Sequence, residues 1–154
     1  MDRCLAALLL LAAAAPAAAQ SRPRYINPPA LPAPRGYSHV VEVPVGARLL
    51  YLSGQVPLDS TGALVGRDDF RAQAHQVFRN LRAGLAAGGA GFADVVKLTF
   101  YLLDVGQLAV LREVRDEYLR GPSPPASTLL EVRRLFRDDV LLEIEAIAVV
   151  PVSP

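Results

Sequence analysis

The sequence contains no tryptophan, one cysteine, one methionine and two histidines. Cys4 lies before an N-terminal apolar run, so the rest of the chain can form no disulfide and offers no thiolate nucleophile or metal ligand. His39 and His75 belong to no cluster with metal-ligand spacing, and Ser53 has no evident histidine and aspartate partners. We therefore expect no metal, no other cofactor and no Ser-His-Asp triad.

The chain also has no excess of charge of either sign. Sixteen basic residues stand against 15 acidic ones, which gives a formal net charge of +1, and the arginines are scattered. A near-neutral surface attracts phosphate backbones weakly, and two isolated histidines provide no pair for acid–base cleavage of RNA. We therefore expect no nucleic-acid partner.

Residues 1–19 have the organisation of a secretory signal peptide. Arg3 is followed by an Ala/Leu run, and small residues precede Gln20. Pro16 interrupts this run before it reaches the ~20 apolar residues that a membrane span needs. We expect cleavage after Ala19, a periplasmic or secreted location, and no membrane association afterwards. A misplaced start codon or a retained anchor are the alternatives.

The remaining residues suit one domain with a substantial core. Residues 20–36 are rich in proline and lack periodicity, which predicts an extended leader on the surface of a domain formed by residues 37–154. Residues 39–45 and 48–56 are runs typical of β-strands, separated by Gly46-Ala47, and predict a hairpin.

Further along, the periodicity changes to that of a helix, which Asp68 or Asp69 can cap and Gly88-Gly89 can end. A strand at 94–104, a second amphipathic helix at 107–121, and strands at 125–132 and 140–150 follow. The apolar face of the first helix is predicted to consist of Phe70, Ala74, Val77, Phe78, Leu81 and Leu85.

This order of elements predicts an α+β fold in which two helices cover one face of a single mixed sheet. Both helix-containing crossovers imply that part of the sheet is parallel. The other face of the sheet would carry uncovered apolar residues. We therefore expect a homo-oligomer.

The last strand places two carboxylates in an apolar run. Alternation puts Leu142 and Ile144 on one face, and Glu143 and Glu145 on the other. Buried carboxylates are costly unless they are paired, for example with Lys97 or Arg134, or unless one of them lines a cleft. An unpaired buried carboxylate has a raised pKa and can act as a general base. The residues alone leave both alternatives open.

Five segments together resemble a known family, and they extend from about Tyr37 to Val150. They are "GYSHVV", "LLYLSGQVPLDSTGALVG", "QVFRNLRAGLAAGGAGFADVVKLTFYLLD", "PAST" with "EVRRL", and "LLEIEAIAVV". The chain is similar in these segments to the Rid (RidA/YjgF) family, also called the endoribonuclease L-PSP family. The resemblance implies a chorismate-mutase-like fold and a homotrimer whose sheets form a central barrel, with small-molecule clefts between the subunits.

The resemblance also implies a chemistry, because active members hydrolyse enamines and imines to 2-oxo acids and ammonia. It implies that Glu143 positions the attacking water as the catalytic residue. Tyr37, Ser53 and Gly54 correspond to pocket residues of the family. An arginine in the family's P-A-R-S motif binds the substrate carboxylate through two parallel charged hydrogen bonds.

This chain departs from that motif, because Ser127 stands at the arginine position and Thr128 at the serine position. A neutral hydroxyl cannot replace a guanidinium clamp. Three hypotheses follow. The first is a cleft for a molecule other than a simple amino-acid imine, contacted by Ser127, Thr128, Tyr37 and Glu143, in which any chemistry is water addition with Glu143 as base. The second is an imine deaminase with a substitute arginine, Arg35 or Arg120, and the third is a non-catalytic binding module.

Overall fold

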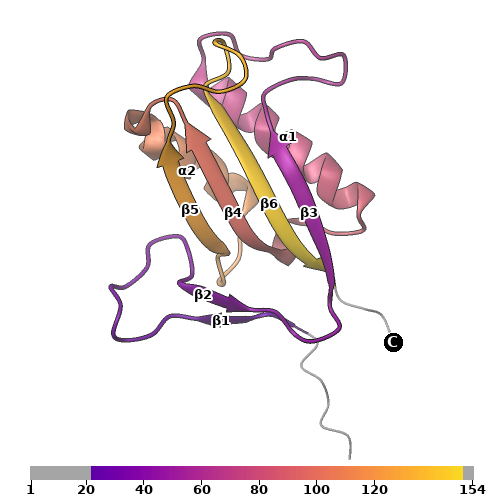
Figure 1. Ribbon diagram of the computed structural model, residues 1–154, viewed down its shortest axis with the longest axis vertical. Helices are drawn as coiled ribbons and strands as arrows, with labels where there is room; N and C mark the ends of the chain where they lie inside the picture. The colour runs from indigo at the N-terminus through magenta and orange to yellow at the C-terminus, as the bar shows by residue number, and fades with distance from the viewer. Residues whose placement is uncertain (1–21, 151–154) are drawn as a thin grey trace, which may run out of the picture.

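The computed structural model describes residues 22–150, so the predicted signal peptide and its cleavage site lie outside the described residues. Figure 1 shows a sheet with both long helices on one side of it and a small two-stranded ribbon across one end. The elements in chain order are β1 (Arg24–Ile26), β2 (Val40–Glu42), β3 (Arg48–Gln55), α1 (Phe70–Ala87), a 3₁₀ turn (Phe92–Asp94), β4 (Val95–Leu102), a second 3₁₀ turn (Val105–Gln107), α2 (Leu108–Tyr118), β5 (Ala126–Glu131) and β6 (Leu142–Val150).

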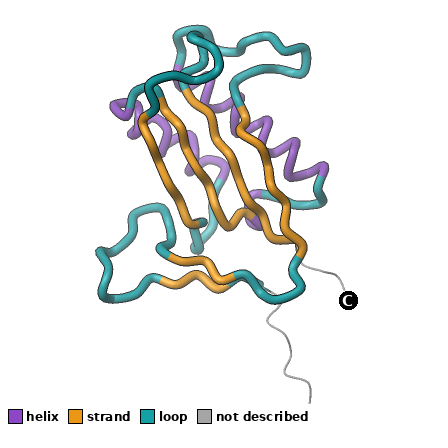
Figure 2. Tube along the Cα trace, viewed as in Figure 1, coloured by secondary structure: helices purple, strands orange, loops and turns teal. Residues whose placement is uncertain are grey.

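The main sheet has the strand order β3-β6-β4-β5. β6 runs antiparallel to β3 and β4, whereas β4 and β5 are parallel and are joined through α2. Figure 2 shows the four long strands side by side, with the helices behind them. The predicted α+β class, with a mixed sheet and two helices on one face, is confirmed.

α1 forms where its caps and apolar period predict it. The Asp69 side chain accepts a hydrogen bond from the Ala72 N–H at 3.0 Å, which satisfies one of the free donors of the first turn. The helix ends at Gly88, and Gly89 then adopts a φ of +75°, a conformation that glycine reaches without steric cost. All six predicted apolar-face residues are buried.

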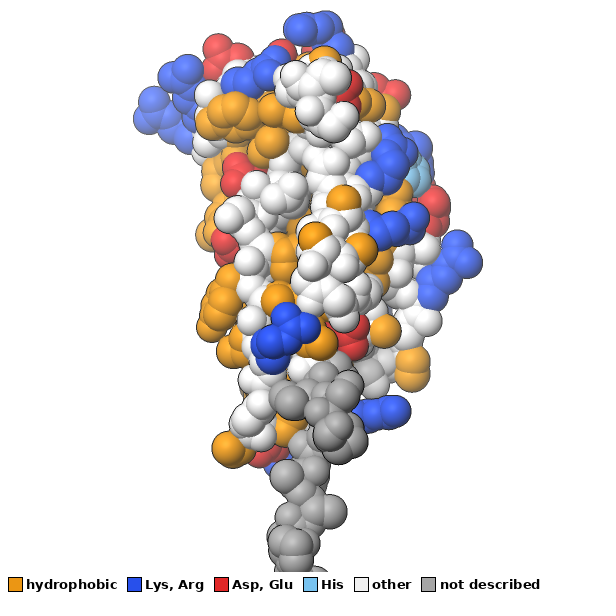
Figure 3. All heavy atoms as spheres, turned by 90° about the vertical axis from the view of Figure 1, so that its right-hand side faces the viewer, with side chains coloured by type: hydrophobic (Ala, Val, Ile, Leu, Met, Phe, Trp, Pro, Cys, Tyr) orange, Lys and Arg blue, Asp and Glu red, His pale blue; other side chains and the backbone are white. Residues whose placement is uncertain are grey.

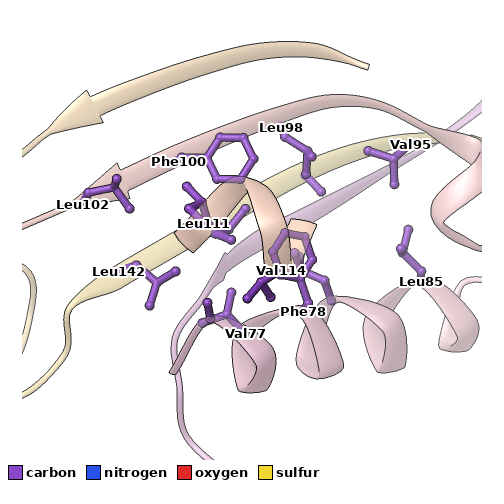
Figure 4. Close-up of a cluster of buried hydrophobic side chains, with 14 of the residues drawn as sticks. Val77, Phe78, Leu85, Val95, Leu98, Phe100, Leu102, Leu111, Val114 and Leu142 are labelled. Atoms are coloured by element: carbon purple, nitrogen blue, oxygen red, sulfur yellow. The ribbon is translucent and has the colours of Figure 1, made fainter. Parts of the chain in front are cut away.

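The core lies between this helix layer and the sheet. Figure 4 shows Phe78 and Leu85 of α1 and Val114 of α2 facing side chains of β4 and β6. Gln73 is a polar exception with no exposed surface. Its amide donates to the backbone oxygens of Gly66 (3.0 Å) and Asp139 (2.9 Å) and accepts from the Leu141 N–H (2.8 Å), so it ties the loops that precede α1 and β6 to this helix.

The predicted hairpin between residues 39–45 and 48–56 is wrong. β2 pairs instead with β1, a strand within the proline-rich leader, and an Arg24–Glu42 ion pair of 2.6 Å joins the two. Pro44 follows β2, and because proline has no N–H it cannot extend a ladder toward β3. β3 pairs with β6, which allows Leu50 and Leu52 to pack against the core.

The surface shows no dominant charge. On the face in Figure 3, basic side chains are separated by acidic and uncharged ones. Within residues 22–150, no helix combines the length and apolar character that a membrane crossing requires.

Candidate functional site

β6 separates its side chains as its alternation predicts. Leu142 and Ile144 are fully buried under the helices, whereas Glu143 and Glu145 lie half-buried on the opposite face of the sheet, which we call the open face. No lysine, arginine or histidine of the described chain lies within ion-pair distance of either carboxylate, and Arg134 pairs with Asp138 at 3.3 Å. The structure therefore contains no ion pair of Glu143 or Glu145 with Lys97 or Arg134.

Glu145 belongs to a polar group on the open face. The Tyr101 hydroxyl donates to its Oε1 at 3.3 Å, and a cavity of about 320 Å³ beside it is lined by Ser53, Lys97 and Thr99 among others. Desolvation and the Glu145 carboxylate raise the pKa of Tyr101 above its usual value, so this hydroxyl remains a donor. Lys97 Nζ donates to the Thr128 hydroxyl, which places Thr128 on the same face.

Glu143 lies against Gly54, at an irregularity in the pairing of β3 with β6 between Leu52 and Gln55. A Cβ at Gly54 would stand 2.6 Å from Glu143 Cδ, closer than non-bonded carbons approach. The absence of a side chain at Gly54 therefore makes the space that the Glu143 carboxylate occupies. The structure thus brings together Ser53, Gly54 and Glu143, three of the residues that the sequence predicts for the site.

Tyr37 and Ser127 meet at a different place. They line a cavity of about 230 Å³ between α2 and the start of β5. The segment that carries Tyr37 is held there by Ser38, whose hydroxyl donates to the Pro124 oxygen at 2.6 Å and whose N–H donates to the Pro125 oxygen at 3.0 Å. These bonds hold Tyr37 next to Ser127, although the two residues are far apart in the chain.

Three arginines line the same cavity: Arg35, Arg112 and Arg115. The sequence indicated Arg35 as a possible substitute clamp, but not the two arginines of α2. Arg120 lines a different cavity, and its Nε donates to the Glu117 oxygen at 2.9 Å. The structure therefore supports Arg35, and not Arg120, as a neighbour of Ser127.

The predicted site residues form two groups on opposite faces of one protomer. Ser127 pairs with Leu98, which is buried on the helix side, and its cavity includes residues of α2. Glu143 pairs with Tyr101, whose hydroxyl bonds Glu145 on the open face. A single copy therefore does not bring Tyr37 and Ser127 to Glu143.

The described part of the chain offers no metal centre, since no three His, Cys, Asp or Glu side chains within it are grouped to hold an ion. The chemistry available is that of carboxylate, hydroxyl and guanidinium groups. Glu143 can accept a proton, and the three arginines can bind an anion.

Two helices on one face of a mixed four-stranded sheet, with a carboxylate on its open face, define a RidA-like α+β domain. The profile of the family described as Endoribonuclease L-PSP matches residues 28–150. The chain belongs to this family, the Rid family, as the resemblance implied.

Individual relatives agree with this assignment. A RutC family protein of Pyrococcus horikoshii is 41% identical over 118 residues, which cover 76% of this chain and 90% of that protein. A 2-iminobutanoate/2-iminopropanoate deaminase of Dermatophagoides farinae is 32% identical over 128 residues, which cover 82% of this chain and 96% of that protein. A solved structure of a Rid family protein from Yersinia pestis superposes with a TM-score of 0.76 at 36% identity and covers 83% of this chain and 98% of that one.

Proposed function

We propose that this protein hydrolyses an imine or enamine other than those of simple monocarboxylic amino acids, in a small-molecule cleft formed between the subunits of a homotrimer. The observation that carries the proposal is the separation of the two residue groups. Tyr37 and Ser127 lie on the helix side and Glu143 lies on the open face, which supports a cleft in which a second copy supplies the other half. The similarity to an imine deaminase supports the reaction class.

Assembly is supported by the apolar side chains of the open face. Tyr51 is 75% exposed, Leu130 42% and Leu49 40% in the single chain. Exposed apolar residues of this size on one sheet face are typical of a surface that another subunit covers. Packing of the open faces around one axis would bury them. It would also place a neighbouring subunit beside the sheet edge formed by β5, the strand that carries Ser127.

The reaction needs no redox partner. The oxygen of a water molecule adds to the imine carbon while the Glu143 carboxylate accepts one of its protons. The imine nitrogen takes up a proton, which gives a carbinolamine. The carbinolamine hydroxyl then loses its proton and becomes the carbonyl of a 2-oxo acid, while the C–N bond breaks and the nitrogen takes the proton held by Glu143 and leaves as ammonia. Because Ser127 stands where the family has an arginine, the usual carboxylate-binding group is missing. The substrate is therefore anchored by other residues of the cleft.

The test compares Glu143→Gln with the matched variant Glu145→Gln. Imines are generated in situ by an amino-acid oxidase, and the fraction trapped by semicarbazide measures how much escapes hydrolysis. We expect Glu143→Gln to lower the rate by about 100-fold, the usual contribution of a positioned base, with far less loss in Glu145→Gln. Light scattering reports whether each variant is a trimer.

If Glu143→Gln retains the full rate, the assignment of Glu143 is wrong. If the wild type accelerates hydrolysis of no imine tested, the protein is a binding module rather than a hydrolase.

Export is a separate proposal. The exported protein should begin at Gln20, which N-terminal sequencing checks.

A further inference from the structure

Three arginines line the cavity beside Ser127, and two of them, Arg35 and Arg112, are exposed to solvent. Along α2, Leu108 and Leu111 face the sheet, and Arg112 and Arg115 follow them at one-turn spacing along the same border of the helix. Arg35 approaches from the segment that Ser38 holds against β5. Cations from two separate parts of the chain therefore meet at one small cavity.

The positions of these groups are fixed by packing on one side. Gly36 has a φ of +76°, and a Cβ there would stand 3.1 Å from Arg115 Cζ, so the backbone of this segment lies directly on that guanidinium. A side chain at position 36 would be strained by the positive φ and would displace the Arg115 guanidinium. The glycine thus allows Arg35 and α2 to share the cavity.

Among the described residues, an acid pairs with only one of these three arginines. Arg115 pairs with Asp116 at 2.7 Å. Arg35 and Arg112 have no acidic partner within 4 Å among residues 22–150. Two positive charges therefore remain for a ligand, and a guanidinium binds a carboxylate best because its two N–H donors match the two oxygens.

The rest of the cavity is apolar. Its wall is formed by Phe100, Leu108, Leu111 and Leu129, and Ser127 contributes a small hydroxyl. A ligand that fits has a short hydrocarbon segment against this wall and acid groups directed at the arginines. A ligand whose only acid group is the one on the imine carbon would leave Arg35 or Arg112 without a partner.

From this arrangement we infer that the substrate is the imine or enamine of a dicarboxylic amino acid, selected by Arg35 and Arg112 in place of the arginine that the family has at position 127. The inference rests on the proposed function for the reaction and adds the substrate class. Arg35 and Arg112 are specificity-determining residues that bind carboxylate.

Binding is tested first, because it requires no turnover. Calorimetric titration of the full assembly compares glutarate with pentanoate, which has the same chain length and one carboxylate fewer. Glutarate should bind about tenfold or more tightly, and added salt should reduce the difference. Arg35→Ala and Arg112→Ala should each weaken glutarate binding about tenfold, while Arg79→Ala, on the exposed side of α1, should leave it unchanged.

Turnover is tested second, with 2-iminoglutarate from glutamate and 2-iminohexanoate from norleucine. The dicarboxylic imine should be hydrolysed faster, and either arginine variant should remove the preference by raising KM for 2-iminoglutarate.

Equal binding of glutarate and pentanoate, or arginine variants without effect, would overturn the inference while leaving imine hydrolysis intact. Charge-selective binding of glutarate without turnover would overturn the proposed function and retain the dicarboxylate site. Binding of inorganic phosphate in preference to glutarate would replace the dicarboxylate by a phosphate ester.

Discussion

The contact between Gly54 and Glu143 gives a prediction that does not depend on knowing the substrate. In Gly54→Ala, the new Cβ would stand 2.6 Å from Glu143 Cδ and 2.9 Å from Cγ. Non-bonded carbons pack at about 3.5–4.0 Å, so the carboxylate must move by about 1 Å. Because Cγ is involved, the movement requires a change of side-chain torsion, and not only of the carboxylate end.

The magnitude follows from two opposing terms. Displacing the Glu143 side chain from its rotamer costs about 0.5–1.5 kcal/mol. Gly54 has no positive φ, so alanine fits the backbone there and stabilises the fold by about 0.4–1 kcal/mol through the unfolded state. Gly54→Ala should therefore change the free energy of unfolding by less than about 1 kcal/mol. In the Glu143→Ala background there is no glutamate side chain to displace, so only the effect on the unfolded state remains. There, Gly54→Ala should raise the free energy of unfolding.

The assay is a double-mutant cycle by denaturant unfolding at one protein concentration. The coupling between Gly54→Ala and Glu143→Ala should be about 0.5–1.5 kcal/mol. Gly91→Ala is the matched control, since a Cβ there would meet nothing within 4 Å, and it should show no coupling. Hydrolysis by Gly54→Ala should fall nearly as far as in Glu143→Gln. Strict additivity of the two changes would refute the idea that Gly54 makes the space for this carboxylate.

Three further predictions concern stability and titration. Gln73→Leu should lower the free energy of unfolding by about 3 kcal/mol, because it leaves three partly buried backbone groups without their partner; urea unfolding measures this. The raised pKa of Tyr101 favours the native state until the pH rises through it, so Tyr101→Phe should lose less stability above about pH 10, and its tyrosinate absorbance should lack one of the phases that titrate above the usual tyrosine pKa. A hydrogen bond from Arg137 lowers the pKa of Asp139. The ionised Asp139 therefore stabilises the fold above about pH 4, and this contribution is lost as the pH falls further. The free energy of unfolding of Arg137→Ala should depend less on pH in that range.

The elements that the sequence predicts well are those fixed by neighbours in the chain. α1 is specified by its own period of apolar residues and by Asp69 and Gly88 at its ends. The alternation of β6 likewise requires only that one face be buried, so the positions of Glu143 and Ile144 followed directly.

The hairpin between β2 and β3 failed because strand pairing is decided by residues far away. β3 has its partner about a hundred residues later, in β6, and β2 has its partner in the proline-rich leader, where a three-residue strand gives no pattern. A short connection between two β-rich runs was compatible with a hairpin, but it did not require one.

For the site, the sequence predicted the residue types but not their separation across the sheet. Whether Ser127 faces the same side as Glu143 depends on the registers of β5 and β6 with β4, which no local pattern records. Arg112 and Arg115 resembled ordinary solvent-facing helix residues. Their spacing of one turn from Leu108 and Leu111, along the border of the apolar face, was the available signal.

The position of β6 has a consequence for biosynthesis. This strand lies between β3 and β4, yet it is the last of the four to leave the ribosome. Nascent chains that stop short of Leu142 have a gap in the middle of their sheet, with β3 and β4 unable to bond each other across it. Cotranslational folding of this domain must therefore wait for its final strand, which makes premature termination more damaging here than in a fold whose last strand is added at an edge.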